Sequence, residues 1–464
     1  MTLPRGSGGV PRKHFGTDGV RGLANVELTP ELALALGRAA VRVLGADRPF
    51  VLARDTRRSG PMLEAALAAG LGSEGADVVL AGVMPTPGAA YLSQSRDCPA
   101  AVLSASHNLF PDNGIKFFAR GGRKLTDEIE ARFEAELDAL LAGRAAPTRV
   151  EGAAVGTARV DEGALREYET RLLTTLEGRR LEALRVVVDC GNGAAAVAAP
   201  WVLTQLGAKV ENLAIGASPS GTNINAGCGS THPGPLQAEV VSTGAAAGLA
   251  FDGDADRLVA VDERGGLVDG DHILAIAALD LRARGRLRHD TVVATVMANL
   301  GFHQAMAAAG VRVETTPVGD RSVLEAMEAG GFCLGGEQSG HVIFGDLATT
   351  GDGLLSGLVL LDVLARSGRP LSELASVVVK LPQVLRNVRV ADRAGLADAA
   401  AFWAEVAAVE AELGGGGRVL VRPSGTEPLV RIMVEAPTEE AATGHTDRLT
   451  VALRAALGDP DPTA

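Results

Sequence analysis

A serine hydroxyl is expected at the end of a buried strand. The apolar run Ala100–Leu103 leads into a polar turn that holds Ser106, His107 and Asn108. A hydrolase-type Ser–His pair explains this turn poorly, because adjacent residues rarely form a nucleophile and its base, and because no G-x-S-x-G elbow is present. An ordinary turn remains the plainer alternative, since Ser and Asn both favour turns.

Three carboxylates at alternate positions form the second chemical signal. Asp252, Asp254 and Asp256 follow the apolar run 246–251, and Arg257 comes directly after them. Alternate spacing in a turn lets three carboxylates converge on one hard cation such as Mg²⁺. A solvated acidic turn explains the cluster poorly, because carboxylates so close together repel one another unless a cation neutralises them.

Two other kinds of site place aspartates in a similar way. An EF-hand would use Glu263 at loop position 12, but position 6 is Arg257 instead of glycine, and the flanks are predicted strands. A haloacid-dehalogenase-type phosphatase would use Asp252 as its nucleophile, but such enzymes place this motif near the start of a domain. A metal turn that works with a remote phosphate carrier fits the strand context best. With Ser106 as the carrier, these residues could hold and transfer a phosphoryl group.

Further polar side chains are suited to a phosphorylated sugar. Arg21 lies in a glycine-bracketed turn that permits close approach of a phosphate. Lys116 precedes two phenylalanines, and apolar surroundings can tune a lysine for acid–base work. Glu337, Ser339 and His341 share a glycine-flanked turn with the mixed donors and acceptors that sugar hydroxyls need. A structural role for His341 is the alternative.

A turn near the C-terminus combines cations with small residues. Arg422 precedes Ser424, Gly425 and Thr426, and Arg431 follows them. Hydroxyls, backbone N–H groups and arginines at a rigid turn form a phosphate cradle. A simple Pro/Gly hairpin would explain the turn but not the two arginines.

Bulk properties exclude several classes of function. The net charge of −12 and the aromatic content of 3% argue against a nucleic-acid partner. Four scattered cysteines predict reduced thiols in a cytoplasmic protein. No run of 18 residues is free of charge or turn signals, so no membrane span is expected. A small anionic molecule remains the expected partner, because a few clustered arginines can make a locally positive cleft.

The elements that must position these residues alternate between helix and strand, which is the pattern of α/β proteins. One helix is marked by Thr29 as N-cap, Pro30 and Gly45, and another at 126–141 is capped by Thr126. At 464 residues the chain is too long for one core. We predict three related α/β domains with mixed sheets and a smaller α+β C-terminal domain, at residues 1–157, 158–256, 257–380 and 381–464.

The ordered stretches FGTDGVRG, SASHN, DGDADR, VGDR, GEQSGH and RPSGTEP resemble the motifs of the α-D-phosphohexomutase superfamily. The match covers nearly the whole chain, and DGDADR and RPSGTEP are most similar to glucosamine-specific members. The resemblance implies a four-domain, heart-shaped enzyme with its active site in a central cleft and a mobile C-terminal lid.

The resemblance also implies a role for each candidate residue. Ser106 would be the phosphorylated serine, and Mg²⁺ would bind the phosphoserine with Asp252, Asp254 and Asp256. Catalytic or phosphate-steadying roles fall on Arg21, His107, Lys116, Arg257 and His341. Substrate binding falls on Glu337, Ser339, Arg422, Ser424, Gly425, Thr426 and Arg431.

The implied reaction interconverts glucosamine 6-phosphate and glucosamine 1-phosphate through a 1,6-bisphosphate, and it would feed UDP-N-acetylglucosamine and cell-wall precursor synthesis. Glucosamine or glucose 1,6-bisphosphate would act as activator, and a protein kinase or autophosphorylation would first load Ser106. A homodimer is usual among such enzymes. The alternatives are a glucose or mannose phosphomutase, a metal-dependent sugar phosphatase and a non-catalytic sugar-phosphate sensor.

Three residues depart from the family pattern. Leu109 stands where the family usually continues SASHN with proline, so a less rigid serine turn is expected. Ser322 replaces a tyrosine after VGDR, and Pro317 precedes that motif. These changes are expected to affect substrate contacts or lid fit, and not phosphoryl transfer.

Overall fold

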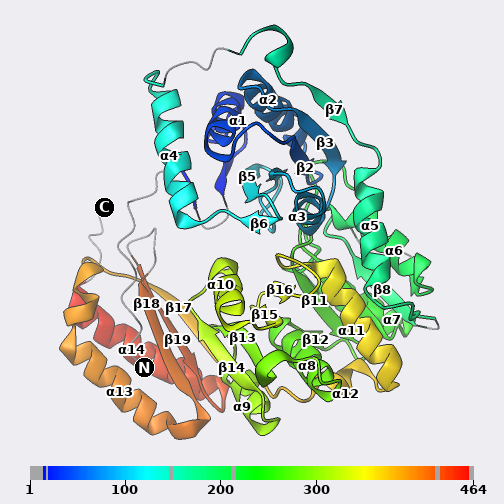
Figure 1. The fold of residues 1–464 in the computed structure, drawn as a ribbon. Coiled ribbons are helices and arrows are strands. Elements are labelled where there is room, and N and C mark those ends of the chain that lie inside the picture. The colour runs from blue at the N-terminus through cyan, green and yellow to red at the C-terminus, as the bar shows by residue number, and fades with distance from the viewer. Residues whose placement is uncertain are drawn as a thin grey trace. The chain divides into compact units, whose positions relative to one another are not determined.

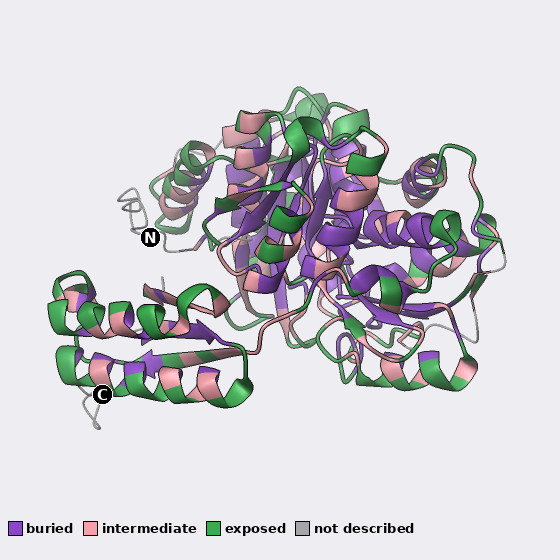
Figure 2. Ribbon diagram, turned by 90° about the horizontal axis from the view of Figure 1, so that it is seen from below, coloured by how far each residue is buried: buried purple, intermediate pink, exposed green. Residues whose placement is uncertain are grey.

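Four β-sheets organise the chain, and each is built from consecutive strands (Figure 1). The structure is a computed structural model that describes residues 14–16, 19–145, 150–182, 184–210, 216–423 and 429–458. Three sheets lie in one compact unit, Met1–Val296 with Val311–Ser376, and the fourth lies in a second, Met297–Gly310 with Val377–Ala464. Figure 2 shows buried strands beside helices whose outer faces are exposed. The predicted α/β class with a smaller C-terminal domain is confirmed.

The first sheet is mixed, with strand order β1-β5-β4-β2-β3-β7 and β6 paired to β5. Its strands are β1 Val20–Leu23, β2 Phe50–Arg54, β3 Val78–Val83, β4 Ala100–Leu103, β5 Asp112–Ala119, β6 Arg123–Lys124 and β7 Ala158–Val160. The accompanying helices are α1 Pro30–Leu44, α2 Gly60–Ser73, α3 Thr86–Ser95 and α4 Asp127–Leu141. β2 and β4 are parallel, so the residues that follow Arg54 and Leu103 emerge at the same edge. The serine turn therefore leaves the sheet beside the segment that follows β2.

Helices α1 and α4 begin where their caps predict. The Thr29 hydroxyl accepts the backbone N–H of Leu32, and α1 ends at Gly45, whose φ is 91°. The Thr126 hydroxyl accepts the N–H of Ile129 at 3.4 Å. Such caps satisfy backbone N–H groups that the first helical turn leaves open.

The second sheet has the order β12-β11-β10-β8-β9, and the third has the order β14-β13-β15-β16. Their strands are β8 Arg185–Asp189, β9 Lys209–Val210, β10 Ala247–Phe251, β11 Leu258–Asp262, β12 Leu267–Val268, β13 Thr291–Thr295, β14 Arg312–Thr316, β15 Leu334–Gly336 and β16 Val342–Phe344. Their helices are α5 Ala164–Thr174, α6 Ala195–Gln205, α7 Gly234–Thr243, α8 Gly270–Ala283, α10 Asp320–Gly330, α11 Gly353–Ser367 and α12 Leu371–Ala375.

Three strands belong to different sheets from those that the expected domain division implies. β11 and β12 were expected to open the third domain at residue 257, but β11 pairs with β10 along its whole length. β7 follows the expected boundary at 157, yet it pairs with β3 of the first sheet. On this pairing we place the first two boundaries after Val160 and Val268.

The C-terminal unit contains the three-stranded sheet β17-β19-β18. Its elements are α9 Leu300–Ala308, β17 Gln383–Arg389, α13 Ala400–Leu413, β18 Arg418–Pro423, β19 Leu429–Glu435 and α14 Glu439–Leu457. Asn299, before α9, exchanges two hydrogen bonds of 3.0 Å with the backbone of Leu381. The buried carboxylate of Glu435 accepts the N–H of Leu300 at 2.9 Å. These contacts explain why α9 belongs to this unit.

No helix among the residues that the structure describes is both long and apolar enough to cross a bilayer.

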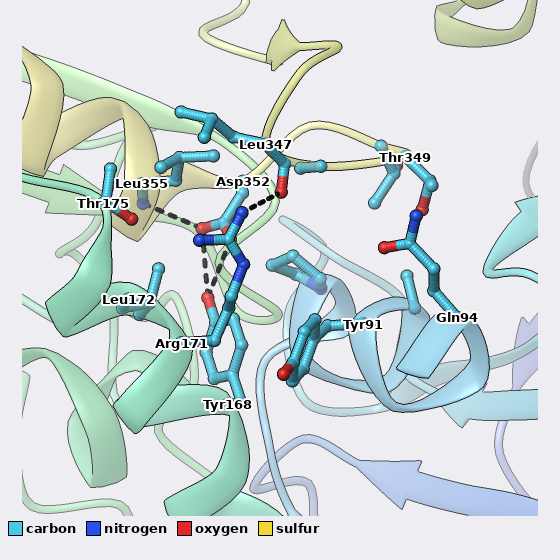
Figure 3. A pocket seen from close by; sticks show the side chains of 14 residues that line it. Tyr91, Gln94, Tyr168, Arg171, Leu172, Thr175, Leu347, Thr349, Asp352 and Leu355 are labelled. Carbon is cyan, nitrogen blue, oxygen red and sulfur yellow. Dashed lines mark hydrogen bonds between the residues drawn. The ribbon is translucent and has the colours of Figure 1, made fainter. Parts of the chain in front are cut away.

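A cavity lies between α3, α5 and the loop before α11 (Figure 3). Tyr91 and Arg171 line it, and the Tyr168 hydroxyl, 3.0 Å from both carboxylate oxygens of Asp352, donates to that carboxylate. Asp352 also caps α11 by accepting the N–H of Leu355 at 2.9 Å. Burial raises the pKa of Asp352 to about 6, because the hydrogen bonds from Leu355 and Tyr168 offset only part of the desolvation.

Glycines set the close crossing of α1 and α2. A Cβ at Gly70 would lie 2.2 Å from the carbonyl oxygen of Leu34, whereas a Cβ at Gly444 in α14 would meet open space. We expect Gly70→Ala to lower the free energy of unfolding by about 1–3 kcal/mol, because the two helices must separate. The control Gly444→Ala should raise it by about 0.4–1 kcal/mol, because alanine loses less entropy in a helix. Chemical denaturation measures both, and equal effects would contradict the packing argument.

Asp352→Asn should stabilise the protein in a pH-dependent way. The folded carboxyl has a pKa near 6, against about 3.8 when unfolded, so wild-type stability falls as pH rises through this window. The asparagine does not titrate and can still cap α11. The stability of the variant relative to wild type should therefore increase between pH 4 and 6 by about 3 kcal/mol and level off above. Thermal unfolding across this pH range tests it, and a constant difference would refute it.

Candidate active site

Ser106 lies on the turn that joins β4 to β5, and its hydroxyl contacts the aspartate cluster. Ser106 is 1% exposed, and its backbone φ of 52° lies in the left-handed region. The hydroxyl donates to Oδ2 of Asp252 at 2.6 Å and lies 3.3 Å from Nδ1 of His107. The first and second sheets thus bring together the two motifs that the sequence singled out.

Asp252, Asp254 and Asp256 lie on the turn between β10 and β11 and are all buried. One carboxylate oxygen from each lies within 4.8 Å of the others. Burial, with the charges of Asp256 and Asp254, raises the pKa of Asp252 well above its usual range. Gly253 permits this approach, because a Cβ there would lie 2.5 Å from the carbonyl oxygen of Ser106.

The donor set of this turn fits a hard divalent cation. Oδ1 of Asp254 and Oδ1 of Asp256 are buried and have no hydrogen-bond partner in the described part of the chain. Buried oxygens without donors are rare, and anionic oxygen atoms are the preferred ligands of Mg²⁺. These two oxygens, together with Asp252 and the serine, are the groups that could coordinate such a cation.

Lys116 on β5 supplies a positive charge to the aspartates. Its ammonium nitrogen lies 2.8 Å from Oδ2 of Asp254 and 3.6 Å from Oδ2 of Asp256. Burial alone would raise the pKa of Asp254, but Lys116 and a 2.7 Å hydrogen bond from Thr86 lower it below its ordinary value. The surroundings of Lys116 are therefore anionic, and not the apolar surface suggested by its sequence neighbours.

His107, Arg257 and Arg21 form a basic group beside the serine. Nη1 of Arg257 lies 3.3 Å from Nδ1 of His107. Burial, with the charges of Arg257 and Arg21, lowers the pKa of His107, which keeps the imidazole neutral near pH 7. Two guanidinium groups that act on the imidazole beside the Ser106 hydroxyl suit a bound phosphate.

The turn between β15 and β16 carries Glu337, Ser339 and His341. Ser339 is exposed and donates to Glu337 at 3.4 Å, whereas His341 is 2% exposed. Nε2 of His341 accepts the N–H of Gly351 at 3.0 Å, so its other nitrogen carries the proton in the neutral ring. That nitrogen lies 3.7 Å from Oδ2 of Asp256. His341 is thus a buried neighbour of the aspartates, while Glu337 and Ser339 remain accessible.

The C-terminal unit places Arg422 and Arg431 directly opposite each other on β18 and β19. Burial and the charge of Arg431 lower the pKa of Arg422. Nε of Arg431 is buried without a hydrogen-bond partner among the described residues. Facing cations are unfavourable unless an anion lies between them. Ser424, Gly425 and Thr426 fall outside the described residues.

Sequence reasoning missed three buried supports of this site. Arg57 contacts the carbonyl oxygens of the serine turn, Asn225 contacts two of the same oxygens, and Thr86 binds Asp254. Arg57 follows the buried strand β2 by three residues, and this position could have indicated that its side chain lies near the serine turn. Asn225 and Thr86 had no such signal, because their contacts join distant parts of the chain.

The domain models of one family match the chain in order. The phosphoglucomutase/phosphomannomutase alpha/beta/alpha domains I, II and III match residues 12–142, 166–266 and 269–381, and the family's C-terminal domain matches 385–450.

Curated relatives match nearly the full length. A phosphoglucosamine mutase of Frankia alni is 55% identical over 458 residues, which cover 96% of this chain and 99% of the relative. A phosphoglucosamine mutase of Desulforudis audaxviator is 54% identical over 439 residues, covering 94% and 96%.

Solved structures share the fold. A phosphoglucomutase/phosphomannomutase family protein of Burkholderia thailandensis has a TM-score of 0.78 at 26% identity, covering 95% of this chain and 97% of that one. An Aspergillus fumigatus N-acetylphosphoglucosamine mutase, in complex with GlcNAc-6P and magnesium, has a TM-score of 0.68 at 18% identity, covering 96% of each chain. The chain therefore belongs to the α-D-phosphohexomutase superfamily and, within it, to the phosphoglucosamine mutase family.

Proposed function

We propose that this chain interconverts D-glucosamine 6-phosphate and D-glucosamine 1-phosphate by way of a phosphoserine at Ser106. The observation that carries the proposal is the 2.6 Å contact between the Ser106 hydroxyl and Asp252 within a buried three-aspartate cluster. Relatives more than half identical over nearly the whole length are named for this reaction, which supports the choice of sugar.

Two phosphoryl transfers complete the reaction. In the first, the oxygen of the free sugar hydroxyl bonds to phosphorus, the bond between phosphorus and Oγ of Ser106 breaks, and the proton of the sugar hydroxyl passes to Oγ, which becomes a serine hydroxyl again. The resulting 1,6-bisphosphate turns around. In the second, Oγ of Ser106 bonds to the phosphorus of the other phosphate, and the bond between that phosphorus and the sugar oxygen breaks. The serine proton leaves toward the acceptors in contact with it, Oδ2 of Asp252 and Nδ1 of His107, and a proton returns to the sugar oxygen. Arg257 and Arg21 steady the charged oxygens during transfer.

Asp252, Asp254 and Asp256, with the phosphate on Ser106, would hold Mg²⁺, which when bound offsets negative charge on the transferring group. Lys116 keeps Asp254 ionised, so that its orphaned Oδ1 is ready to act as a ligand. The magnesium-bound Aspergillus fumigatus enzyme of the same fold supports this choice of metal.

Substrate recognition is proposed for two further groups. Glu337 and Ser339 would bind sugar hydroxyls, because both are accessible on one turn. Arg422 and Arg431, with Ser424, Gly425 and Thr426, would bind a phosphate group of the substrate, since the facing arginines require an anion. His341 would support Asp256 and would contact the ligand less directly than the sequence suggested.

Several expectations stay predictions. They are the bisphosphate activator, the route by which Ser106 is first phosphorylated, the homodimer and the cytoplasmic location. A glucose or mannose phosphomutase is the main alternative reaction, and a phosphatase with Asp252 as nucleophile is the other.

Phosphorus NMR separates these reactions. The protein is incubated with Mg²⁺, a trace of glucose 1,6-bisphosphate, and equal amounts of glucosamine 6-phosphate and glucose 6-phosphate. Glucosamine 1-phosphate should appear first. Glucose 1-phosphate appearing first would keep the mechanism and change the substrate, and inorganic phosphate as the sole product would support the phosphatase.

Replacing Ser106 by alanine should lower turnover in this assay by about 1,000-fold or more, because the phosphoryl carrier is lost. The control Ser367→Ala, at an exposed position near the end of α11, should keep full activity. Near-normal turnover of the Ser106 variant would rule out a phosphoserine mechanism.

Asp254→Asn should weaken Mg²⁺ binding by about 10-fold or more, because one anionic ligand becomes neutral. Titration calorimetry on the metal-free protein measures this directly, without turnover. Asp262→Asn on β11 is the matched control, since Asp262 caps the turn before β12 and lies outside the cluster. Equal affinities for the two variants would contradict the proposed ligand set.

A further inference from the structure

Arg57 is fully buried, with all five guanidinium N–H groups directed at protein acceptors. Nε donates to Oδ2 of Asp55 at 2.9 Å. The other four N–H groups donate, at 3.0, 2.8, 2.5 and 3.0 Å, to the backbone carbonyl oxygens of Ser106, Asn108, Leu109 and Asp112. One side chain therefore gathers four carbonyl groups of the serine turn.

This turn needs an external support, because its backbone is not in a favoured conformation. Ser106 has a φ of 52°, in the left-handed region that non-glycine residues rarely occupy. Such a conformation persists only where the surroundings hold it. The two hydrogen bonds from Nη2 of Arg57 hold the carbonyl groups of Ser106 and Asn108.

The partner of Arg57 supports the N–H side of the same serine. Asp55 is 0% exposed and accepts both the backbone N–H of Arg57 at 2.9 Å and the Ser104 hydroxyl at 2.6 Å. The Ser104 oxygen in turn accepts the N–H of Ser106 at 2.9 Å. The ion pair of Asp55 and Arg57 is thus linked to both the N–H and the carbonyl of Ser106.

Asn225, 1% exposed, adds a contact from the neighbouring domain. Its side-chain N–H groups donate to the carbonyl oxygens of Ser106 and Asn108, both at 2.9 Å. The two oxygens that Nη2 of Arg57 holds therefore receive a second donor each. Asn225 has no such bond to Leu109 or Asp112. There Nη1 of Arg57 is joined by the backbone N–H of Asp112, which donates to the carbonyl oxygen of Leu109 at 3.3 Å.

We infer that Arg57, oriented by Asp55, is a positioning residue that fixes the direction of the Ser106 hydroxyl toward the three aspartates. The inference rests on the proposed function, because it concerns the same serine. Arg57 holds the turn through its backbone, so it acts through Ser106. A lysine would keep the charge, but it has three donors on a single atom and lacks the planar fork that spans four carbonyl groups.

Arg57→Lys should lower kcat by about 100-fold, because a displacement near 1 Å at a reacting atom costs about that much. KM should change by less than about three-fold, since Glu337 and Ser339 lie on a different turn. Arg42→Lys is the matched control: Arg42 is partly buried, makes three hydrogen bonds to Glu74 and Glu136, and lies in the same domain.

Amide hydrogen exchange of the peptide 104–112 gives a readout without turnover. Exchange should be at least about 10-fold faster in Arg57→Lys than in Arg42→Lys, since the single nitrogen of lysine cannot hold all four carbonyl groups. Ser104→Ala, which removes one hydroxyl, is the milder variant should Arg57→Lys fail to fold. It should lower kcat by about 10-fold, with KM unchanged, because the N–H of Ser106 loses its acceptor.

The outcomes distinguish this inference from the proposed function. If the wild-type enzyme does not interconvert glucosamine phosphates, the proposed function fails, and hydrogen exchange still tests the support of the turn. If the folded Arg57→Lys or Ser104→Ala protein keeps wild-type kcat, or if exchange in 104–112 is unchanged, the positioning role is refuted. A parallel rise in KM and fall in melting temperature, with kcat unaltered, would indicate a purely structural arginine.

Discussion

Mutual repulsion among three buried carboxylates is the constraint around which the larger unit is arranged. Asp252, Asp254 and Asp256 lie within 4.8 Å of one another and away from water, so each needs a positive partner or a proton. Lys116 comes from the first sheet to meet this need, and Arg257 follows the aspartates on the same turn. The domains are tied together here because the charge of one is compensated by a side chain of another.

A common local geometry delivers these groups. The serine turn joins β4 to β5, the aspartate turn joins β10 to β11, and the Glu337–His341 turn joins β15 to β16; in each case the two strands are antiparallel neighbours. A turn between paired strands is anchored at both ends, so its side chains are fixed more tightly than those of a free loop. In all three sheets the leading strand also pairs with a parallel strand, which keeps it buried.

Much of the fold and the centre of the site could be predicted from the sequence, because their causes are local. Helices α1 and α4 have caps within a few residues of their ends. The alternate spacing of the three aspartates is enough to predict that their carboxylates converge. Several helices were not predicted, among them α3, which starts at prolines that resemble a loop, and α11, which is apolar on nearly every face. The roles of Arg57, Thr86 and Asn225 depend on contacts between residues 49–168 positions apart, which no local pattern encodes.

The support of the serine turn has an evolutionary consequence. Arg57 grips carbonyl oxygens, and every amino acid has one, so the hold does not depend on which side chains the turn carries. Leu109, 55% exposed, illustrates this: its carbonyl is held while its side chain faces solvent. Exposed side chains of the turn, such as that of Leu109, can therefore be substituted without loss of the hydrogen bonds from Arg57. The position of the Ser106 hydroxyl does not depend on which side chain stands there. Arg57 itself has no such freedom, because each of its guanidinium N–H groups has a defined acceptor.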